Sequence, residues 1–244
     1  MAARWMTQGP TYAATPTRSA TSPHTHAAMD PDATLPAPGP SADPEALMAG
    51  PERAARRLVL LHGWGADADD LLDLGQELVD ATVSVVALRA PQAHPGGFGR
   101  QWYPLSPAPE WVQLPQARQA LRQRLERLAA TVPLEKTALL GFSQGAAMAV
   151  DAAADLPLAA LIACSGYPHP DWQPQPRTPV LLTHGREDGV VLPAASEELE
   201  RKLRAAGGAV RRVEFPGGHG IAPELFPVMR EFLQVGWGGS AEAG

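Results

Sequence analysis

The amino-acid sequence predicts an α/β protein whose mostly parallel sheet is covered by helices on both faces. From residue 56 onward, short runs rich in β-branched residues alternate with segments of helical periodicity. The chain has 244 residues, of which 45% are apolar and 19% charged, as in an ordinary globular protein. This length is enough for one sizeable domain. No internal repeat of about 20 to 50 residues is visible, which excludes solenoids and propellers.

Six apolar runs have the length of strands, and five other segments have the periodicity of helices. The predicted strands cover residues 57–62, 84–89, 136–141, 159–164, 179–184 and 210–215. The predicted helices cover residues 69–79, 115–131, 144–154, 194–206 and 223–235. In the helix over 115–131, Leu121, Leu125 and Leu128 lie on one face, which we expect to face the core.

Residues 1–52 differ in composition from the rest and are predicted to be a disordered tail. They contain nine prolines, many serines and threonines, and no hydrophobic periodicity. The first 29 positions contain no acidic residue, which resembles a transit peptide. The alternative is that the start codon was assigned too early and that translation begins at Met29 or Met48. We place the folded domain at 53–236 and predict a flexible C-terminal tail at 237–244.

Charge and cysteine content limit the kinds of partner. A net charge of -6 without a basic stripe argues against nucleic acid or anionic membranes as partners. No segment approaches the roughly 20 uninterrupted apolar residues of a membrane helix, so we expect no stable membrane insertion. The single cysteine, Cys164, ends an apolar run and is expected to be a small buried thiol. We expect a soluble, cytoplasmic protein that is a monomer or a homodimer.

The segment Gly-Phe-Ser-Gln-Gly at 141–145 lies where a predicted strand meets a predicted helix. This arrangement is typical of a nucleophile elbow, in which a sharp strand-to-helix turn exposes the hydroxyl of Ser143. The turn strains the backbone at the serine, and glycines at 141 and 145 let the strand and helix approach without a Cβ collision. A serine hydroxyl at neutral pH needs a histidine as general base and a carboxylate that orients it.

Two later loops supply candidates for these partners. Asp188 follows the predicted strand 179–184, at the carboxyl edge of the sheet; the alternatives are Glu187 or an Asp-Gly turn with no catalytic part. His219 lies in a glycine-rich loop between the last predicted strand and the last helix. The other histidines lie in the predicted tail, in loops without a partner in sequence, or at strand ends where packing or capping is expected: His24, His26, His62, His94, His169 and His184.

Backbone N–H groups are candidates for stabilising the negative oxygen of a tetrahedral intermediate, each by about 3 to 4 kcal/mol. The elbow offers the N–H of Gln144, the residue after the candidate nucleophile. The segment Leu-His-Gly-Trp-Gly at 61–65 offers the N–H of Trp64, and the alternative is a plain glycine-rich strand exit.

Four segments together resemble the phospholipase/carboxylesterase family, which includes acyl-protein thioesterases. They are residues 61–65, 141–145, 184–191 and 217–220, and the likeness spans about residues 56–235. The resemblance implies an α/β-hydrolase fold without a separate cap domain, acting on small-molecule or acylated esters or thioesters without metal or cofactor. It also implies the role of each site residue: Ser143 as nucleophile, His219 as base, Asp188 as orienting acid, and Trp64 and Gln144 as oxyanion donors.

Trp102 and Tyr103 look like an aromatic pair that lines the substrate side in this family, although Pro104 stands where the family commonly has Asp. We expect the surrounding region 91–113 to form a loop over the site; packing of its aromatic residues onto the sheet is the alternative. Two other functions remain open: a catalytically inactive binding module, and an enzyme like dienelactone hydrolase, which has cysteine at the elbow.

Overall fold

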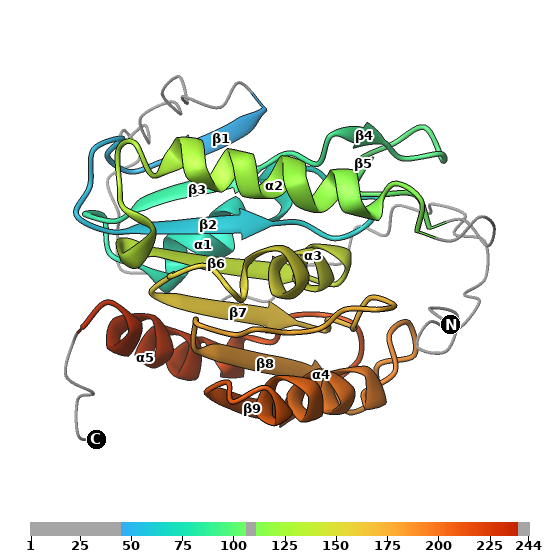
Figure 1. Ribbon diagram of the computed structural model, residues 1–244. Helices are drawn as coiled ribbons and strands as arrows, with labels where there is room; N and C mark the ends of the chain where they lie inside the picture. The colour runs from blue at the N-terminus through green and yellow to red at the C-terminus, as the bar shows by residue number, and fades with distance from the viewer. Residues whose placement is uncertain (1–44, 106–110, 239–244) are drawn as a thin grey trace, which may run out of the picture.

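Seven strands form one central sheet in the spatial order β1-β3-β2-β6-β7-β8-β9 (Figure 1). This computed structural model describes residues 45–105 and 111–238. All neighbouring strands are parallel except β1 and β3, which are antiparallel. The strands are β1 (Ala46–Ala49), β2 (Arg57–Leu61), β3 (Ser84–Leu88), β6 (Thr137–Phe142), β7 (Ala160–Cys164), β8 (Val180–Gly185) and β9 (Val210–Phe215). The α/β-hydrolase fold with a mostly parallel sheet is therefore confirmed.

Helices cover both faces of the sheet, as the sequence predicted (Figure 1). One face packs against α2 (Leu114–Leu128), α3 (Gln144–Ala153) and α4 (Ala194–Ala205), and the other against α1 (Leu72–Leu78) and α5 (Phe226–Gly236). Short 3-10 turns precede α1, β6 and α5: η2 (Ala68–Leu71), η3 (Leu134–Lys136) and η4 (Pro223–Leu225). The predicted helices over 69–79 and 223–235 thus each begin as a 3-10 turn.

Alternate residues of the central strands enter two separate cores. Val59 and Leu139 pack on the side of α2 and α3, whereas their chain neighbours Leu58 and Leu140 pack on the side of α1 and α5. Because both faces are covered, these strands appear in the sequence as continuous apolar runs rather than as an alternating pattern. The leucine stripe of α2 is buried as expected, since Leu121, Leu125 and Leu128 are all at most 3% exposed.

The N-terminal boundary at residue 53 needs a correction, because residues 46–49 of the predicted tail form strand β1. This strand pairs with β3 along its four residues, and Met48 is buried against the core. A start at Met48 would remove half of the strand. One buried side chain in a proline-rich stretch gives no recognisable strand pattern in the sequence. The part of the predicted tail at residues 1–44 lies outside the described residues.

The C-terminal boundary at residue 236 is also too narrow. Trp237, the first residue of the predicted flexible tail, is 8% exposed and packs in the same core as α5. Its indole N–H donates to the carbonyl oxygen of Lys136 at 3.0 Å. Burial of this large ring extends the ordered domain past the predicted end. Residues 239–244 lie outside the described part of the chain.

A small hairpin interrupts the predicted loop 91–113. It consists of β4 (Gln92–Ala93) and β5 (Arg100–Gln101), which pair antiparallel. The backbone of Arg100 exchanges two hydrogen bonds with the loop after β2: it accepts from the N–H of Gly65 and donates to the carbonyl of Ala66, both at 2.8 Å. The hairpin therefore holds the glycine-rich loop at 61–65 in place.

The turn between strand β6 and helix α3 is flanked by two positions, 141 and 145, where only glycine fits, as the sequence predicted. A Cβ atom added to Gly141 would lie 2.4 Å from the carbonyl oxygen of Gly145, and one added to Gly145 would lie 2.1 Å from that of Leu61. Real carbon and oxygen atoms do not approach so closely, so a side chain would push α3 away from β2.

Gly145→Ala should therefore lower the free energy of unfolding by about 3 kcal/mol or more, because the contacting atoms are backbone and cannot move aside. Urea denaturation measures this change. The control is Gly189→Ala, since a Cβ there would meet no atom within 4 Å. Equal stability of the two variants would contradict the proposed close packing.

Candidate active site

Ser143 occupies the sharp turn between β6 and α3, with φ of 53° and ψ of -116°. A positive φ is unfavourable for a residue with a Cβ and costs about 1–3 kcal/mol. Hydrogen bonds hold the backbone on both sides: the N–H of Ser143 donates to Cys164 at 2.8 Å, and its carbonyl accepts from Ala147 at 3.0 Å. The strained conformation predicted for an elbow is present, and it is held by the sheet and the helix.

The side chains of Ser143, His219 and Asp188 form a hydrogen-bonded chain. His219 Nε2 lies 3.0 Å from Ser143 Oγ, and His219 Nδ1 lies 2.7 Å from Asp188 Oδ2. The three residues follow β6, β8 and β9, whose carboxyl ends meet at one edge of the parallel sheet. Glu187, the alternative acid, is exposed to solvent. With Nδ1–H donated to the carboxylate, Nε2 is left as the acceptor for the serine hydroxyl.

Asp188 is a buried carboxylate with a full set of donors. Its Oδ1 accepts the backbone N–H groups of Val190 and Val191, both at 2.9 Å. Its Oδ2 accepts from His219 and also lies 3.3 Å from His184 Nε2. Burial by itself raises the pKa of Asp188, but the hydrogen bonds from His184, His219 and the backbone outweigh it and hold the pKa well below its usual range. The carboxylate is therefore charged at neutral pH.

The loop that carries His219 is fastened to the loop that carries Asp188. The N–H of Glu187 donates to the carbonyl of Gly217 at 2.9 Å. A Cβ atom on Gly185 would lie 2.2 Å from the carbonyl oxygen of Gly218, so the two loops are in backbone contact. The imidazole of His219 also packs on the ring of Phe142, with centroids 4.9 Å apart. These contacts limit the positions that the imidazole can take.

The loop after β2 lies beside Ser143. A Cβ atom on Gly63 would be 3.5 Å from the Cβ of Ser143. Neither the backbone N–H of Trp64 nor that of Gln144 donates to another residue within the described chain. Gln144 is the first residue of α3, where helix N–H groups have no partner in the helix. Both predicted oxyanion donors are thus available for an external acceptor.

His62 holds this loop through both ring nitrogens. Its Nε2 accepts the N–H of Ala90 at 3.1 Å, so the proton is on Nδ1, which donates to the carbonyl of Gly63 at 2.8 Å. Burial lowers the pKa of His62 despite the hydrogen bond to Gly63 and nearby acidic residues, which keeps the ring neutral. Sequence reasoning assigned only a packing or capping role to this strand-end histidine. Its place directly before the glycine-rich turn was the available signal.

The structure corrects the predicted substrate-lining role of Trp102 and Tyr103. Their exposed fractions are only 2% and 1%, so their side chains contact protein rather than an open surface. The Gln144 side chain accepts from the N–H of Trp102 at 2.9 Å and donates to the carbonyl of Tyr103 at 2.8 Å. The indole N–H of Trp102 donates to the carbonyl of His62 at 2.9 Å. Trp102 and Tyr103 therefore follow the alternative expectation, in which the aromatic residues of region 91–113 pack onto the sheet.

Tyr103 belongs to a buried polar network. Its hydroxyl lies 2.6 Å from that of Tyr167 and 2.7 Å from His169 Nε2. His169 Nδ1 lies 2.5 Å from Asp151 on α3, and that carboxylate also pairs with Arg118 at 2.7 Å. Burial, and to a lesser extent the charge of Asp151, raise the pKa of Tyr103, which keeps its hydroxyl neutral. Burial lowers the pKa of His169 despite the hydrogen bond to Asp151, so the imidazole is neutral as well. Asp151 lies inside α3 rather than in a strand-end loop, so no local pattern in the sequence indicated this partner.

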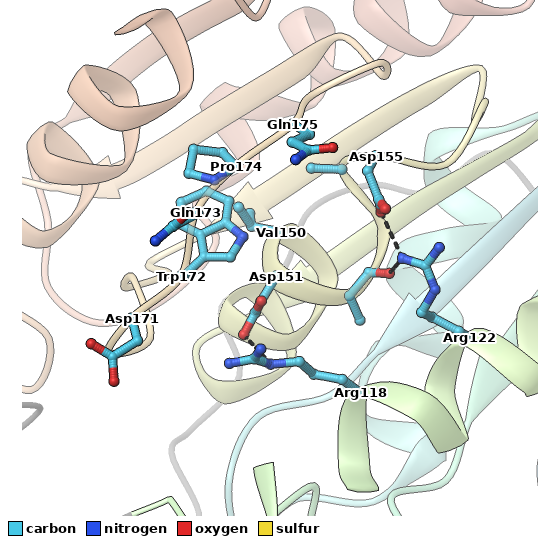
Figure 2. Close-up of a pocket in the computed structure, with 12 residues that line it drawn as sticks. Arg118, Arg122, Val150, Asp151, Asp155, Asp171, Trp172, Gln173, Pro174 and Gln175 are labelled. Carbon is cyan, nitrogen blue, oxygen red and sulfur yellow. Dashed lines mark hydrogen bonds and ion pairs between the residues drawn. The ribbon is translucent and has the colours of Figure 1, made fainter. Parts of the chain in front are cut away.

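Two clefts lie near these residues. One, of about 410 Å³, borders His219 and has an apolar floor. The other, of about 370 Å³, lies beside α2 and α3, and its arginines point toward aspartates (Figure 2). There Arg118 pairs with Asp151 and Arg122 with Asp155, both at 2.7 Å. Ser143, Asp188 and His219 do not line this second cleft. His219 lines the first cleft, whereas Ser143 and Asp188 do not, so this cleft adjoins the candidate site on the side of the imidazole.

Other sequence expectations concern a thiol, metals and membranes. Cys164 is buried as predicted, and burial raises its pKa to about 12, which keeps the thiol protonated. Among residues 45–105 and 111–238, no cluster of His, Cys, Asp and Glu could hold a metal ion. Within the same ranges no helix is both long and apolar enough to cross a membrane.

Asp188→Asn should flatten the acid limb of the stability profile. Because the native pKa of Asp188 lies below its value in the unfolded chain, near 3.9, its stabilisation is present above about pH 5 and is lost as pH falls toward the native pKa. Urea denaturation below pH 5 should show a slope smaller by up to about 1.4 kcal/mol per pH unit in the variant. Asp69→Asn, at an exposed carboxylate, is the control. An unchanged slope in Asp188→Asn would refute the assignment.

Comparison with known proteins shows the family of this chain. A family model described as Phospholipase/Carboxylesterase matches residues 43–236. The crystal structure of esterase PE8 is 33% identical over 78% of this chain and 98% of its own, with a TM-score of 0.72. Two other crystal structures share the fold. A Bacillus cereus carboxylesterase is 22% identical over 78% of this chain and 93% of its own, with a TM-score of 0.69. Arabidopsis thaliana SOBER1 is 22% identical over 74% of this chain and 98% of its own, with a TM-score of 0.65. The chain belongs to the phospholipase/carboxylesterase family and is a hydrolase of the ester-cleaving type.

Proposed function

We propose that this protein is a serine hydrolase that cleaves carboxylic esters or thioesters through an acyl-enzyme on Ser143. One observation carries the proposal: Ser143 Oγ, the imidazole of His219 and the carboxylate of Asp188 are linked at 3.0 and 2.7 Å. These distances are within hydrogen-bond reach for both proton transfer and orientation of the base. Carboxylesterase, acyl thioesterase and lysophospholipase activities are the members of this reaction class.

In the first step, Ser143 Oγ attacks the acyl carbonyl while His219 Nε2 takes the hydroxyl proton. The charged carboxylate of Asp188 stabilises the imidazolium that forms. The backbone N–H groups of Trp64 and Gln144 donate to the negative oxygen of the tetrahedral intermediate. His219 then protonates the departing alcohol or thiol, which leaves the acyl group on Ser143. In the second step, water follows the same route and releases the acid.

The two competing functions, a dienelactone hydrolase and an inactive binding module, would require other residues at the elbow or among its partners. A dienelactone hydrolase has cysteine at the elbow, whereas this chain has Ser143. An inactive binding module typically lacks one of the three side chains, and here all three are present and hydrogen-bonded. The likeness to esterase PE8, at 33% identity, also supports a hydrolytic role.

Ser143→Ala should abolish burst-phase acyl-enzyme formation with p-nitrophenyl acetate, because no nucleophile remains, while urea denaturation shows an intact fold. A fluorophosphonate probe should label the wild-type protein on Ser143 and leave the variant unlabelled. Any residual turnover within about tenfold of the wild type, or labelling of the variant, would rule out Ser143 as the nucleophile.

Trp102→Phe should lower kcat by about tenfold or more with a small change in KM, since the loop that carries the Trp64 N–H loses its anchor at the carbonyl of His62. The matched control is Trp237→Phe, which removes an indole donor to the carbonyl of Lys136, at the opposite end of β6 from Ser143. Steady-state kinetics with one p-nitrophenyl ester separates the two variants. A similar loss of kcat in both would show that the effect is one of general stability.

A further inference from the structure

The cleft beside His219 has an apolar floor and an acidic rim. Its floor consists of five side chains from three parts of the fold: Leu71, Leu74, Phe142, Ile221 and Phe226. Three carboxylates stand around it: Asp70, Asp73 and Glu77. The volume of about 410 Å³ is in the range of small-molecule sites. We refer to this feature as the His219 cleft.

The position of the cleft indicates which half of an ester it takes. In the proposed reaction, the departing oxygen or sulfur must receive its proton from His219 Nε2, so it leaves on the side of the imidazole. His219 and Gly220 themselves line the His219 cleft, and so does Phe142, which packs on the imidazole. A group attached to the departing atom therefore extends into this cleft, whereas the acyl group lies on the other side of the carbonyl carbon.

The charges on the rim indicate which leaving groups fit. Neither Asp70 nor Asp73 forms an ion pair with another described residue, and Glu77 has a single, long pair with Arg230 at 3.7 Å. No lysine or arginine lines the cleft. These carboxylates would repel a negatively charged leaving group by about 1 kcal/mol or more for each close pair of charges. Arg230 does not line the cleft, but its guanidinium lies over the ring of Phe226, 5.9 Å from the ring centroid, and the ring of Phe142 packs on His219. The charge argument therefore depends on the carboxylates rather than on the aromatic rings.

We infer that the His219 cleft binds the alcohol or thiol half of the substrate and selects leaving groups that are apolar and either uncharged or cationic. Leaving groups that bear phosphate or carboxylate are disfavoured. The inference rests on the proposed function and narrows its substrate class, because it excludes anionic lysophospholipids and nucleotide-bearing thioesters as good substrates.

Three acetate esters with alcohols of similar shape test the charge selection. The alcohols are choline, 3,3-dimethylbutanol and 4-hydroxy-2,2-dimethylbutanoate, which are cationic, neutral and anionic. We expect kcat/KM to fall in that order, with the anionic ester about tenfold or more below the neutral one. Added salt should compress the differences, because it screens exposed charges. Equal values for the three esters at low salt would overturn the inference.

The double variant Asp70→Asn/Asp73→Asn should reduce the ratio of kcat/KM for the cationic ester to kcat/KM for the anionic ester by about fivefold or more. The reason is that both unpaired carboxylates are neutralised. The control is Asp69→Asn, at an exposed carboxylate that does not line the cleft, and it should retain the wild-type ratio. A double variant with an unchanged ratio would overturn the inference, since the selection would then come from elsewhere.

Leu74→Ala tests whether the alcohol half or the acyl half occupies the cleft. In acetate esters of methanol to hexanol, we expect the gain in kcat/KM with alcohol length to shrink about threefold or more in the variant. Methyl esters of lengthening acids should show no such change. The matched control is Leu72→Ala, on the same helix but outside the cleft. Loss of the acyl-length dependence instead would assign the cleft to the acyl half and overturn the inference.

These results are distinguishable from failure of the proposed function. If wild-type protein hydrolyses p-nitrophenyl acetate and Ser143→Ala does not, the proposed function stands. Equal kcat/KM values for the cationic, neutral and anionic esters would then overturn the leaving-group assignment alone. If the wild-type protein hydrolyses none of the esters, the proposed function fails and the leaving-group assignment fails with it.

Discussion

The candidate site depends on a backbone contact between α3 and β2. Gly145 lies so close to the carbonyl of Leu61 that no side chain fits between them. Because of this contact, α3 begins directly at the end of β6, and the chain must turn sharply at Ser143. The same contact brings the start of α3 next to the loop after β2, and that loop lies beside Ser143 at Gly63. A single close approach thus positions the proposed nucleophile beside the two segments that carry the proposed oxyanion donors.

A layer of buried polar groups holds these backbone segments in position. The side chain of Gln144 is central to this layer, since it accepts from the N–H of Trp102 and donates to the carbonyl of Tyr103. Trp102 and His62 then fasten the loop after β2. Burial of an unpaired polar group would be costly, so each of these hydrogen bonds also restricts the alternatives open to the loop. The aromatic residues that resemble substrate contacts in this family are, in this chain, part of the support.

Charge is distributed differently on the two sides of the proposed general base. Beneath His219, the buried carboxylate of Asp188 is surrounded by donors, which keeps it ionised. Beside it, the His219 cleft has carboxylates only at its exposed rim and apolar side chains on its floor. The first arrangement suits stabilisation of an imidazolium, and the second suits departure of an uncharged or cationic group. The donors around Asp188 come from loops at the carboxyl edge of the sheet, whereas the carboxylates of the cleft come from η2 and α1.

The sequence by itself determined the fold class, the central strands and the candidate residues at the elbow and its two partner loops. These features are local, because apolar runs, glycine spacing and strand-end loops are visible within a few residues. Strand β1 escaped prediction, since its order comes from pairing with β3 rather than from its own four residues. The burial of Trp102 and the partner of His169 also depend on residues far away in the chain. Only the tertiary structure decided them, because contacts between distant segments leave no periodicity in the sequence.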